Sequence, residues 1–356
     1  MTRIYLDHNA TTPLGAAARA AMVAALDELG NPSSLHAEGR RARELVERAR
    51  DEVARVIGGR REEIVLTSGG TEANNLALRL GARALISAIE HPSVAGAAGP
   101  DARRVRVDRD GRVDLDELAA LLDGGATLVS VQLANHEIGV VQDLPAIIAA
   151  ARERGARVHT DAVQAVGKLA VDVRALGVDA LTLSAHKLGG PKGSGALWLR
   201  DGLDVEALVR GGHQERERRA GTENVVGIAG FGAACAAATA AALPSSALRD
   251  RFEAGARALG ARVAGQGAPR VPTTSYVAFD GVPGELLMQA LDLEGVAVST
   301  GAACSSGSLE PSPVLRAIDF PEGIRVSVGA GNTAAEIDRV LALLPELLAR
   351  IRRAQA

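Results

Sequence analysis

One lysine stands where a buried strand is expected to end. Lys187 follows the apolar run 180–183 and precedes the glycine-rich stretch 189–193. An amine at the end of a buried strand can be desolvated, which makes it nucleophilic. A surface lysine in a glycine loop is the ordinary alternative, and it would be preferred if Lys187 stood alone. Other reactive side chains accompany it.

A carboxylate occupies the same kind of position. Asp161 ends the expected strand 157–160, and Gln164 lies three residues further on. Such a carboxylate could pair with a protonated pyridine nitrogen and keep the ring an electron sink. For this residue alone, capping the following helix is an equally good explanation. Ligands of open α/β sheets gather at the carboxyl ends of strands, where Asp161 and Lys187 both fall.

Glycines and hydroxyl groups lie between an expected strand and an expected helix. The stretch 68–72, Ser-Gly-Gly-Thr-Glu, follows the strand 64–67 and opens a helix. Backbone N–H groups at a helix N-terminus bind phosphate, although a plain capped turn is the alternative. The chain has no G-x-G-x-x-G or Walker A motif, which makes a nucleotide the poorer candidate.

The two cysteines differ in their surroundings. Cys304 lies among small and polar residues, whereas Cys235 lies in an alanine-rich helical run. A thiol in an exposed loop is a candidate nucleophile, whereas a cysteine in an apolar helix is usually an inert core residue. Two cysteines in 356 residues make no disulfide scaffold. Together with a first segment that lacks an apolar signal, they favour a cytoplasmic location.

Two further side chains could take part in chemistry. His91 precedes Pro92 near an expected strand end, where a neutral imidazole could stack on a ring or move protons. Arg325 could bind a carboxylate with two hydrogen bonds. A hydrogen-bonded loop histidine and a structural salt bridge are the respective alternatives.

The elements that must position these residues alternate along the chain. Helical periodicity covers 39–57, 115–122 and 145–154, between short apolar runs at 64–67, 84–87, 128–131, 157–160, 180–183 and 195–199. This alternation predicts a buried, mostly parallel sheet. It fades after an alanine-rich helix near 227–243, so we expect a large domain at 15–243 and a smaller α+β domain from 1–14 and 244–356.

Composition narrows the class of protein. Apolar residues make up 47% of the chain, aromatic residues 2%, and the formal net charge is −3. The charge argues against stable nucleic-acid binding, and no apolar stretch of about 18 residues predicts a membrane span.

Together these motifs resemble the cysteine desulfurases of the NifS/IscS type, which are class V aminotransferase-like enzymes of fold-type I. The resemblance runs through Tyr5–Pro13, Gly30–Ser34, Thr67–Asn75, Glu90–His91, Glu137–Gly139, Asp161–Gly167, Ser184–Gly193, Arg219–Thr222, Cys304–Pro311 and Arg325–Gly329. It implies a large domain with a mostly parallel seven-stranded sheet, the cofactor pyridoxal 5'-phosphate, and the release of L-alanine from L-cysteine. The sulfur would remain as a persulfide on Cys304.

The resemblance also implies roles for single residues. Lys187 would be the Schiff-base lysine, Asp161 the partner of the pyridine nitrogen and His91 the histidine stacked on the ring. Arg325 and Asn9 would bind the substrate, with no resident metal, although Cys304 could transiently meet an iron–sulfur cluster. The remaining cofactor ligands would be Gly70, Thr71, His136, Gln164, Ser184, His186 and, from a neighbouring subunit of a homodimer, Thr222.

The chain departs from the family pattern at His136, where asparagine is usual, and the segment after His91 is shortened. We expect the end at Ala356 to lack the tail with which some members dock a scaffold protein. A sulfur acceptor for iron–sulfur cluster, thio-cofactor or tRNA synthesis remains a partner to identify. The alternatives are a selenocysteine lyase or aminotransferase of the same fold, or a non-catalytic sulfur-carrier scaffold.

Overall fold

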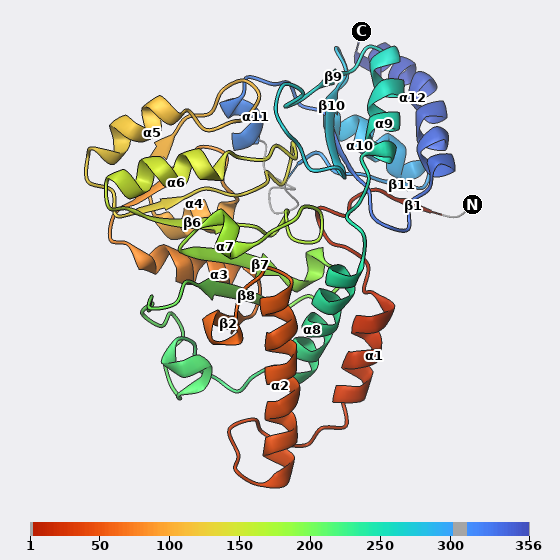
Figure 1. Ribbon diagram of the computed structural model, residues 1–356. Helices are drawn as coiled ribbons and strands as arrows, with labels where there is room; N and C mark the ends of the chain where they lie inside the picture. The colour runs from red at the N-terminus through yellow and green to blue at the C-terminus, as the bar shows by residue number, and fades with distance from the viewer. Residues whose placement is uncertain (1–2, 302–311, 356) are drawn as a thin grey trace.

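A seven-stranded sheet forms the centre of the chain in the computed structural model, which describes residues 3–301 and 312–355 (Figure 1). Six of the strands run in the same direction, and β8 lies antiparallel to both of its neighbours. The order across the sheet is β2 (Ile64–Thr67), β8 (Gly195–Leu199), β7 (Ala180–Ser184), β6 (Arg157–Asp161), β5 (Leu128–Ser130), β3 (Ala84–Ser87) and β4 (Arg103–Val105).

The strands form where apolar or small residues are buried on both faces of the sheet. Every residue of β2, β5, β7 and β8 is buried, as expected for a sheet covered by helices on both sides. One polar side chain also lies inside the sheet. His159 of β6 makes hydrogen bonds to Ser130 Oγ at 2.8 Å and Thr182 Oγ1 at 3.0 Å. Burial lowers its pKa to about 3, so this imidazole is neutral.

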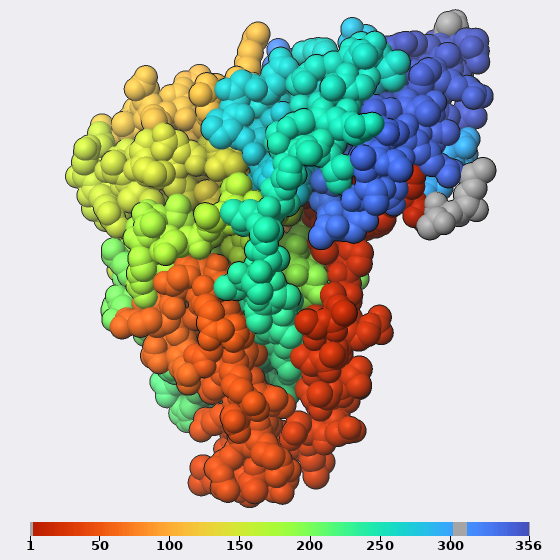
Figure 2. All heavy atoms as spheres, turned by 45° about the vertical axis from the view of Figure 1, so that its right-hand side comes forward, coloured from red at the N-terminus to blue at the C-terminus, as the bar shows by residue number. Residues whose placement is uncertain are grey.

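Helices cover the sheet, and small residues bring some of them very close together. A Cβ added at Gly232 of α8 would lie 2.5 Å from Ala49 Cα of α2, and one at Gly230 would lie 2.6 Å from Met22 of α1. Figures 1 and 2 show α1, α2 and α8 side by side. The helices of this part are α1 (Ala16–Ala25), α2 (Ala37–Arg55), α3 (Gly70–Ala77), α4 (Pro92–Ala98), α5 (Leu115–Leu122), α6 (Leu144–Glu153), α7 (Val173–Leu176) and α8 (Val225–Ala240).

A second hydrophobic core joins the two ends of the chain. It contains Ile4 and Leu6 together with residues from 252 to 351. Its elements are β1 (Ile4–Tyr5), α9 (Ala247–Ala258), β9 (Arg262–Val263), β10 (Thr274–Ala278), α10 (Gly284–Leu293), β11 (Val296–Ala297), β12 (Ile324–Ser327) and α12 (Ala334–Gln355). The short helix α11 (Pro313–Ala317) packs instead in a smaller cluster with Ile138 and Val140. Because this core is separate from the one under the large sheet, we propose the domain division at residues 243 and 244 that the sequence predicts.

The expected strands and helices are present, with ends that shift by a few residues. The short edge strand β4 and the antiparallel direction of β8 were not anticipated. Within residues 3–301 and 312–355, no helix is both long and apolar enough to cross a membrane.

Candidate active site

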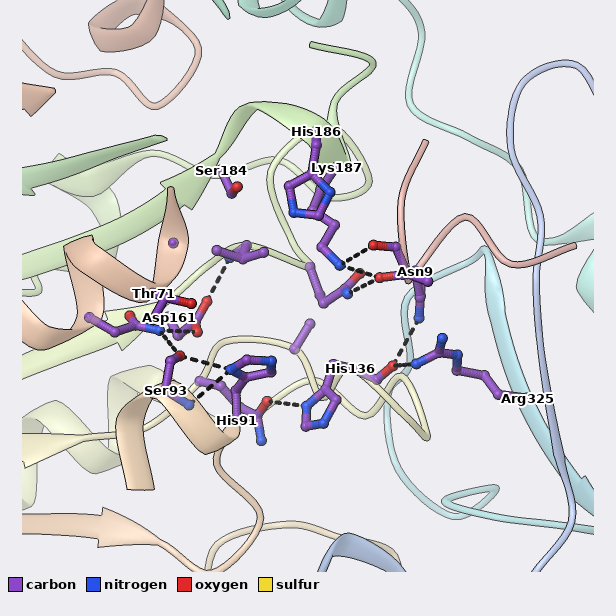
Figure 3. Close-up of a pocket in the computed structure, with 17 residues that line it drawn as sticks. Asn9, Thr71, His91, Ser93, His136, Asp161, Ser184, His186, Lys187 and Arg325 are labelled. Carbon is purple, nitrogen blue, oxygen red and sulfur yellow. Dashed lines mark hydrogen bonds between the residues drawn. The ribbon is translucent and has the colours of Figure 1, made fainter. Parts of the chain in front are cut away.

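One cavity of about 190 Å³ lies at the carboxyl ends of β6 and β7, beside the N-terminal segment of the chain (Figure 3). It brings together most of the side chains that the sequence singles out. The predicted residues that line it are Asn9, Gly70, Thr71, His91, His136, Asp161, Gln164, Ser184, His186, Lys187 and Arg325.

Lys187 lies in the short helical turn η3 (Ala185–Lys187) directly after β7. Its Nζ donates to the carbonyl oxygens of Asn9 and, at 2.9 Å, Ala10. The neighbouring His186 has its Nδ1 at 3.2 Å from Thr11 Oγ1. Burial, followed by the charge of Lys187, lowers the pKa of His186 to about 4. The N-terminal segment therefore holds the lysine turn against the cavity.

A chain of hydrogen bonds connects Asp161 with His91. One oxygen of Asp161 accepts the backbone N–H of Val163 at 2.9 Å, and the other accepts Asn74 Nδ2 at 2.8 Å. The same Asn74 nitrogen donates to Ser93 Oγ at 2.9 Å, and Ser93 Oγ lies 2.8 Å from His91 Nδ1. The Asp161 carboxylate thus caps a turn and also lines the cavity.

The environment of His91 sets its tautomer and its charge. Its Nδ1 accepts the backbone N–H of Ser93 at 3.1 Å, at the start of α4. The proton of a neutral ring must then lie on Nε2. Burial, followed by the nearby His136, lowers the pKa of His91 to about 4. The two imidazoles meet edge to face, with their centroids 5.2 Å apart.

The end of the cavity near α3 has the form of an anion cradle. Gly69 has a φ of 154°, and a Cβ added at Gly195 of β8 would lie 2.6 Å from it. Two glycines therefore permit the close approach that brings the start of α3, with Gly70 and Thr71, beside Ser184. Backbone N–H groups, hydroxyls and an imidazole form a donor set that suits phosphate.

Arg325 is a buried arginine that lines the cavity and is held by two hydrogen bonds. The side chain is only 2% exposed and donates to His136 O at 2.9 Å and Asp7 Oδ1 at 2.7 Å. Its Nε has no hydrogen-bond partner within the described residues, although it is buried. A buried, unsatisfied donor on an arginine that lines the cavity is free to bind an anionic ligand.

Two predicted site residues are not found in this cavity. Thr222 is exposed and does not line the cavity of its own chain. Cys304 lies outside the described residues. The other cysteine, Cys235, is buried in α8, and burial raises the pKa of its thiol, which fits an inert core residue.

Four polar residues of the site were not assigned a role from the sequence. Asn74, Ser93 and Gln132 line the cavity, and Lys168 lies directly behind it. Asn74 lies within Thr67–Asn75, one of the motifs of the family resemblance, and this position is the sequence signal that could have identified it. Lys168 lies four positions after Gln164, but its hydrogen bond to Asn9 spans 159 positions, and the local spacing alone does not place it at the site.

The fold and the site define an α/β enzyme of the class V aminotransferase type. The family described as aminotransferase class-V matches residues 4–340. A cysteine desulfurase from Cereibacter sphaeroides is 44% identical and covers 99% of this chain and 97% of its own length.

Solved structures give the same result. A NifS-like protein superposes with a TM-score of 0.90 at 32% identity and covers 98% of this chain and all of its own. A structure of SspA in complex with cysteine has a TM-score of 0.79 at 30% identity, covering 92% of this chain and 99% of its own. The chain belongs to the aminotransferase class-V family, among its cysteine desulfurases. The resemblance and the fold class predicted from the sequence are confirmed.

Proposed function

We propose that the chain is a pyridoxal-phosphate-dependent cysteine desulfurase with Lys187 as its cofactor lysine and Cys304 as its persulfide cysteine. The observation that carries the proposal is the single cavity in which Lys187, Asp161 and His91 meet beside an anion cradle. The cysteine desulfurase relatives and the cysteine complex of SspA support the same activity and substrate.

The residues present fit pyridoxal 5'-phosphate. Ser184, His186, Thr71 and the backbone at Gly70 would hold the phosphate, and the buried carboxylate of Asp161 would pair with the ring nitrogen. Neutral His91 would stack on the ring, with Gln164 and His136 beside the ring hydroxyl. When bound, this cofactor supplies an electron sink for charge that develops at the Cα atom of an amino acid.

The chain's own residues would then bind L-cysteine and move its protons. Arg325 would bind the substrate carboxylate through its unsatisfied Nε, with Asn9 beside it. Lys187 would remove the Cα proton as a general base. Because the pKa of His91 is lowered to about 4, its ring is neutral near pH 7, which favours stacking over proton donation.

Sulfur transfer requires the Cys304 thiolate. The thiolate would attack the sulfur of bound cysteine, so that an S–S bond forms while the Cβ–S bond breaks and leaves its electron pair on carbon. Protonation of Cβ, and the return of a proton from Lys187 to Cα, would then give L-alanine, and no external oxidant is needed. The product on the enzyme would be a persulfide on Cys304.

The remaining parts of the proposal concern partners and location. We infer a cytoplasmic homodimer in which Thr222 completes the phosphate site of its neighbour. A sulfur acceptor or scaffold protein would take the persulfide sulfur, for example for iron–sulfur cluster assembly.

The assignment of Lys187 can be tested chemically. Borohydride reduction of the protein with pyridoxal phosphate, followed by peptide mapping, should find the pyridoxyl group on Lys187, because its Nζ lies in the cavity. Lys187→Ala should leave no reducible cofactor. Finding the label on Lys168 or Lys192 would overturn the assignment.

The persulfide mechanism can be tested with the two cysteines as a matched pair. Cys304→Ala should bind pyridoxal phosphate as the wild type does, yet give neither alanine nor protein-bound persulfide from cysteine. Cys235→Ala should leave turnover unchanged, because Cys235 is buried in α8. Alanine production near the wild-type rate by Cys304→Ala would exclude the persulfide mechanism and favour a direct lyase.

A further inference from the structure

Lysine is scarce in this chain, and its few positions are informative. The sequence has 40 cationic side chains, of which only Lys168, Lys187 and Lys192 are lysines. Arginine takes every other cationic position. Lys192 is exposed, whereas Lys187 lines the cavity and Lys168 is buried behind it. The lysine at 168 therefore stands at a buried position in a chain that otherwise prefers arginine.

The contacts of Lys168 tie it to two cavity residues. Its Nζ donates to Gln164 Oε1 at 2.6 Å and to Asn9 Oδ1 at 2.7 Å. Gln164 Nε2 in turn donates to the carbonyl oxygen of Asn9 at 3.0 Å. The side chain is 8% exposed and does not line the cavity itself. Lys168 therefore contacts the lining of the site from behind, through the two amide side chains.

We propose that Lys168 is a positioning residue that fixes the side-chain amides of Gln164 and Asn9, so that Gln164 presents an N–H donor to the bound cofactor. The inference rests on the proposed function, because it takes Gln164 as a ligand of the pyridoxal phosphate ring hydroxyl. It adds a role for a residue that does not touch the cofactor.

The two ends of a glutamine amide differ, because its oxygen accepts hydrogen bonds and its nitrogen donates them. A glutamine can turn by 180° and exchange its oxygen for its nitrogen at little steric cost. The N–H groups of Lys168 need acceptors, so they hold the oxygen of Gln164 on their side and leave its nitrogen to face Asn9 O and the cavity. An N–H aimed at the ring oxygen favours the anionic form of that oxygen.

Lysine suits this position better than arginine does. One nitrogen of Lys168 reaches two oxygen atoms on different elements, whereas a guanidinium spreads its donors over a rigid planar fork. Burial, followed by the charges of Lys187 and Arg325, lowers the pKa of Lys168 well below its usual value. An ammonium has three N–H groups and a neutral amine has two, so both hydrogen bonds persist in either state.

Cofactor binding gives the first test. Lys168→Met keeps the length of the side chain and removes its donors. We expect its Kd for pyridoxal 5'-phosphate to rise about tenfold, and the visible absorption band of the bound cofactor to shift. Lys168→Arg should change both readouts in the same direction. The control Lys192→Met, which removes an exposed lysine, should give a much smaller change in Kd and no shift of the band.

A double-mutant cycle separates positioning from a merely structural role. If Lys168 acts through Gln164, adding Lys168→Met to Gln164→Ala should shift the band no further. Equal shifts in both backgrounds, or a wild-type band and Kd in Lys168→Met, would overturn the inference. The proposed function would stand if the wild type bound pyridoxal phosphate at Lys187 while no Lys168 variant changed the Kd or the absorption band. A wild-type chain that binds no pyridoxal phosphate would overturn both.

If Lys168→Met does not fold, a different substitution tests the inference. Gln164→Glu keeps an oxygen against the Lys168 amine but replaces the N–H that faces the Asn9 carbonyl oxygen, whereas Gln164→Met removes both hydrogen bonds. We therefore expect the cofactor-free Gln164→Glu variant to have a Tm at least as high as that of Gln164→Met. Without a facing amine, the carboxylate would be buried and unpaired, which is strongly destabilising. A Tm of Gln164→Glu several degrees below that of Gln164→Met would therefore overturn the inference.

Discussion

Asn74 shares one amide nitrogen between two functional parts of the site. Its Nδ2 donates both to the Asp161 carboxylate and to the Ser93 hydroxyl that contacts His91. The residue is 1% exposed, and its Oδ1 has no partner within the described residues. Because the buried Oδ1 of Asn74 is unsatisfied, the hydrogen bonds that its Nδ2 donates are what hold the side chain in this position. Asn74 therefore couples the residue expected beneath the ring nitrogen to the one expected on the ring face.

We predict that Asn74→Ala weakens cofactor binding. The Asp161 carboxylate would lose one of its two hydrogen bonds, and a hydrogen bond to a charged group contributes about 1.5–3 kcal/mol. The Kd for pyridoxal phosphate, measured by fluorescence titration, should rise by about tenfold or more. The control Asn75→Ala removes the neighbouring amide, whose hydrogen bond within the described part of the chain goes to the Thr71 carbonyl of its own helix. Equal affinities for both variants would contradict the role given to Asn74.

The residues of the site differ in how far the sequence could predict them. Asp161 is the last residue of β6, and Lys187 and Thr71 lie within one turn of the ends of β7 and β2, so strand ends and side-chain chemistry together located them. Lys168 contacts Gln164 four positions away, but its second acceptor, Asn9, is 159 positions away, and Asn74 contacts Asp161 87 positions away. Such partners are set by tertiary packing, which no local spacing encodes.

At the scale of elements, one carboxyl group links the ends of two strands. Glu90 follows β3, and its Oε1 accepts the Ser87 hydroxyl at 2.5 Å and the backbone N–H of Gln132, just after β5, at 2.9 Å. Burial, only partly offset by these two bonds, raises the pKa of Glu90 to about 8. The group is thus protonated near neutral pH while it supports the turn that carries His91.

This linkage predicts a pH dependence of stability. Between pH 4.5 and about 8 the folded state keeps the Glu90 proton, whereas the unfolded state has released it. The free energy of unfolding should therefore fall as pH rises through this window, by on the order of a few kcal/mol. Glu90→Gln, which cannot ionise, should remove most of this fall in denaturant titrations at pH 5 and pH 8. Glu294→Gln, at an exposed site, should behave as the wild type. A wild-type slope in Glu90→Gln would contradict the prediction.

Strand and helix positions were predictable because apolar runs and helical periods are local. The direction of β8 was not predictable. Every residue of β8 is buried, so its apolar run would look the same for a parallel and an antiparallel strand. The glycine-rich turn after Lys187 joins β7 to β8 in the antiparallel direction. The edge strand β4, with two exposed arginines in three residues, lacks the apolar run that revealed the others.

At the scale of the whole molecule, the segment that carries Thr222 is held in an unusual backbone conformation. Glu215, Arg216 and Glu217 all have positive φ values, between 49° and 67°. Arg50 of α2 makes two hydrogen bonds to the buried Glu215 carboxylate, at 2.5 and 2.7 Å. Strained backbone persists only where its surroundings fix it, and this ion pair fixes the start of a segment whose end, Thr222, is exposed.

A fixed segment with an exposed end supports the expectation that Thr222 serves a neighbouring subunit. We predict that the protein sediments as a dimer and that two defective chains complement each other. Thr222→Val should weaken pyridoxal phosphate binding, and Lys187→Ala should bind none that borohydride can reduce. In a mixed dimer, the Thr222→Val chain keeps its own Lys187 and receives the intact Thr222 of its partner. Co-expression with two different affinity tags, followed by borohydride labelling at limiting cofactor, should therefore restore one wild-type site per mixed dimer. If Thr222 acted within its own chain, the mixed dimer would label no better than Thr222→Val alone, and the shared site would be excluded.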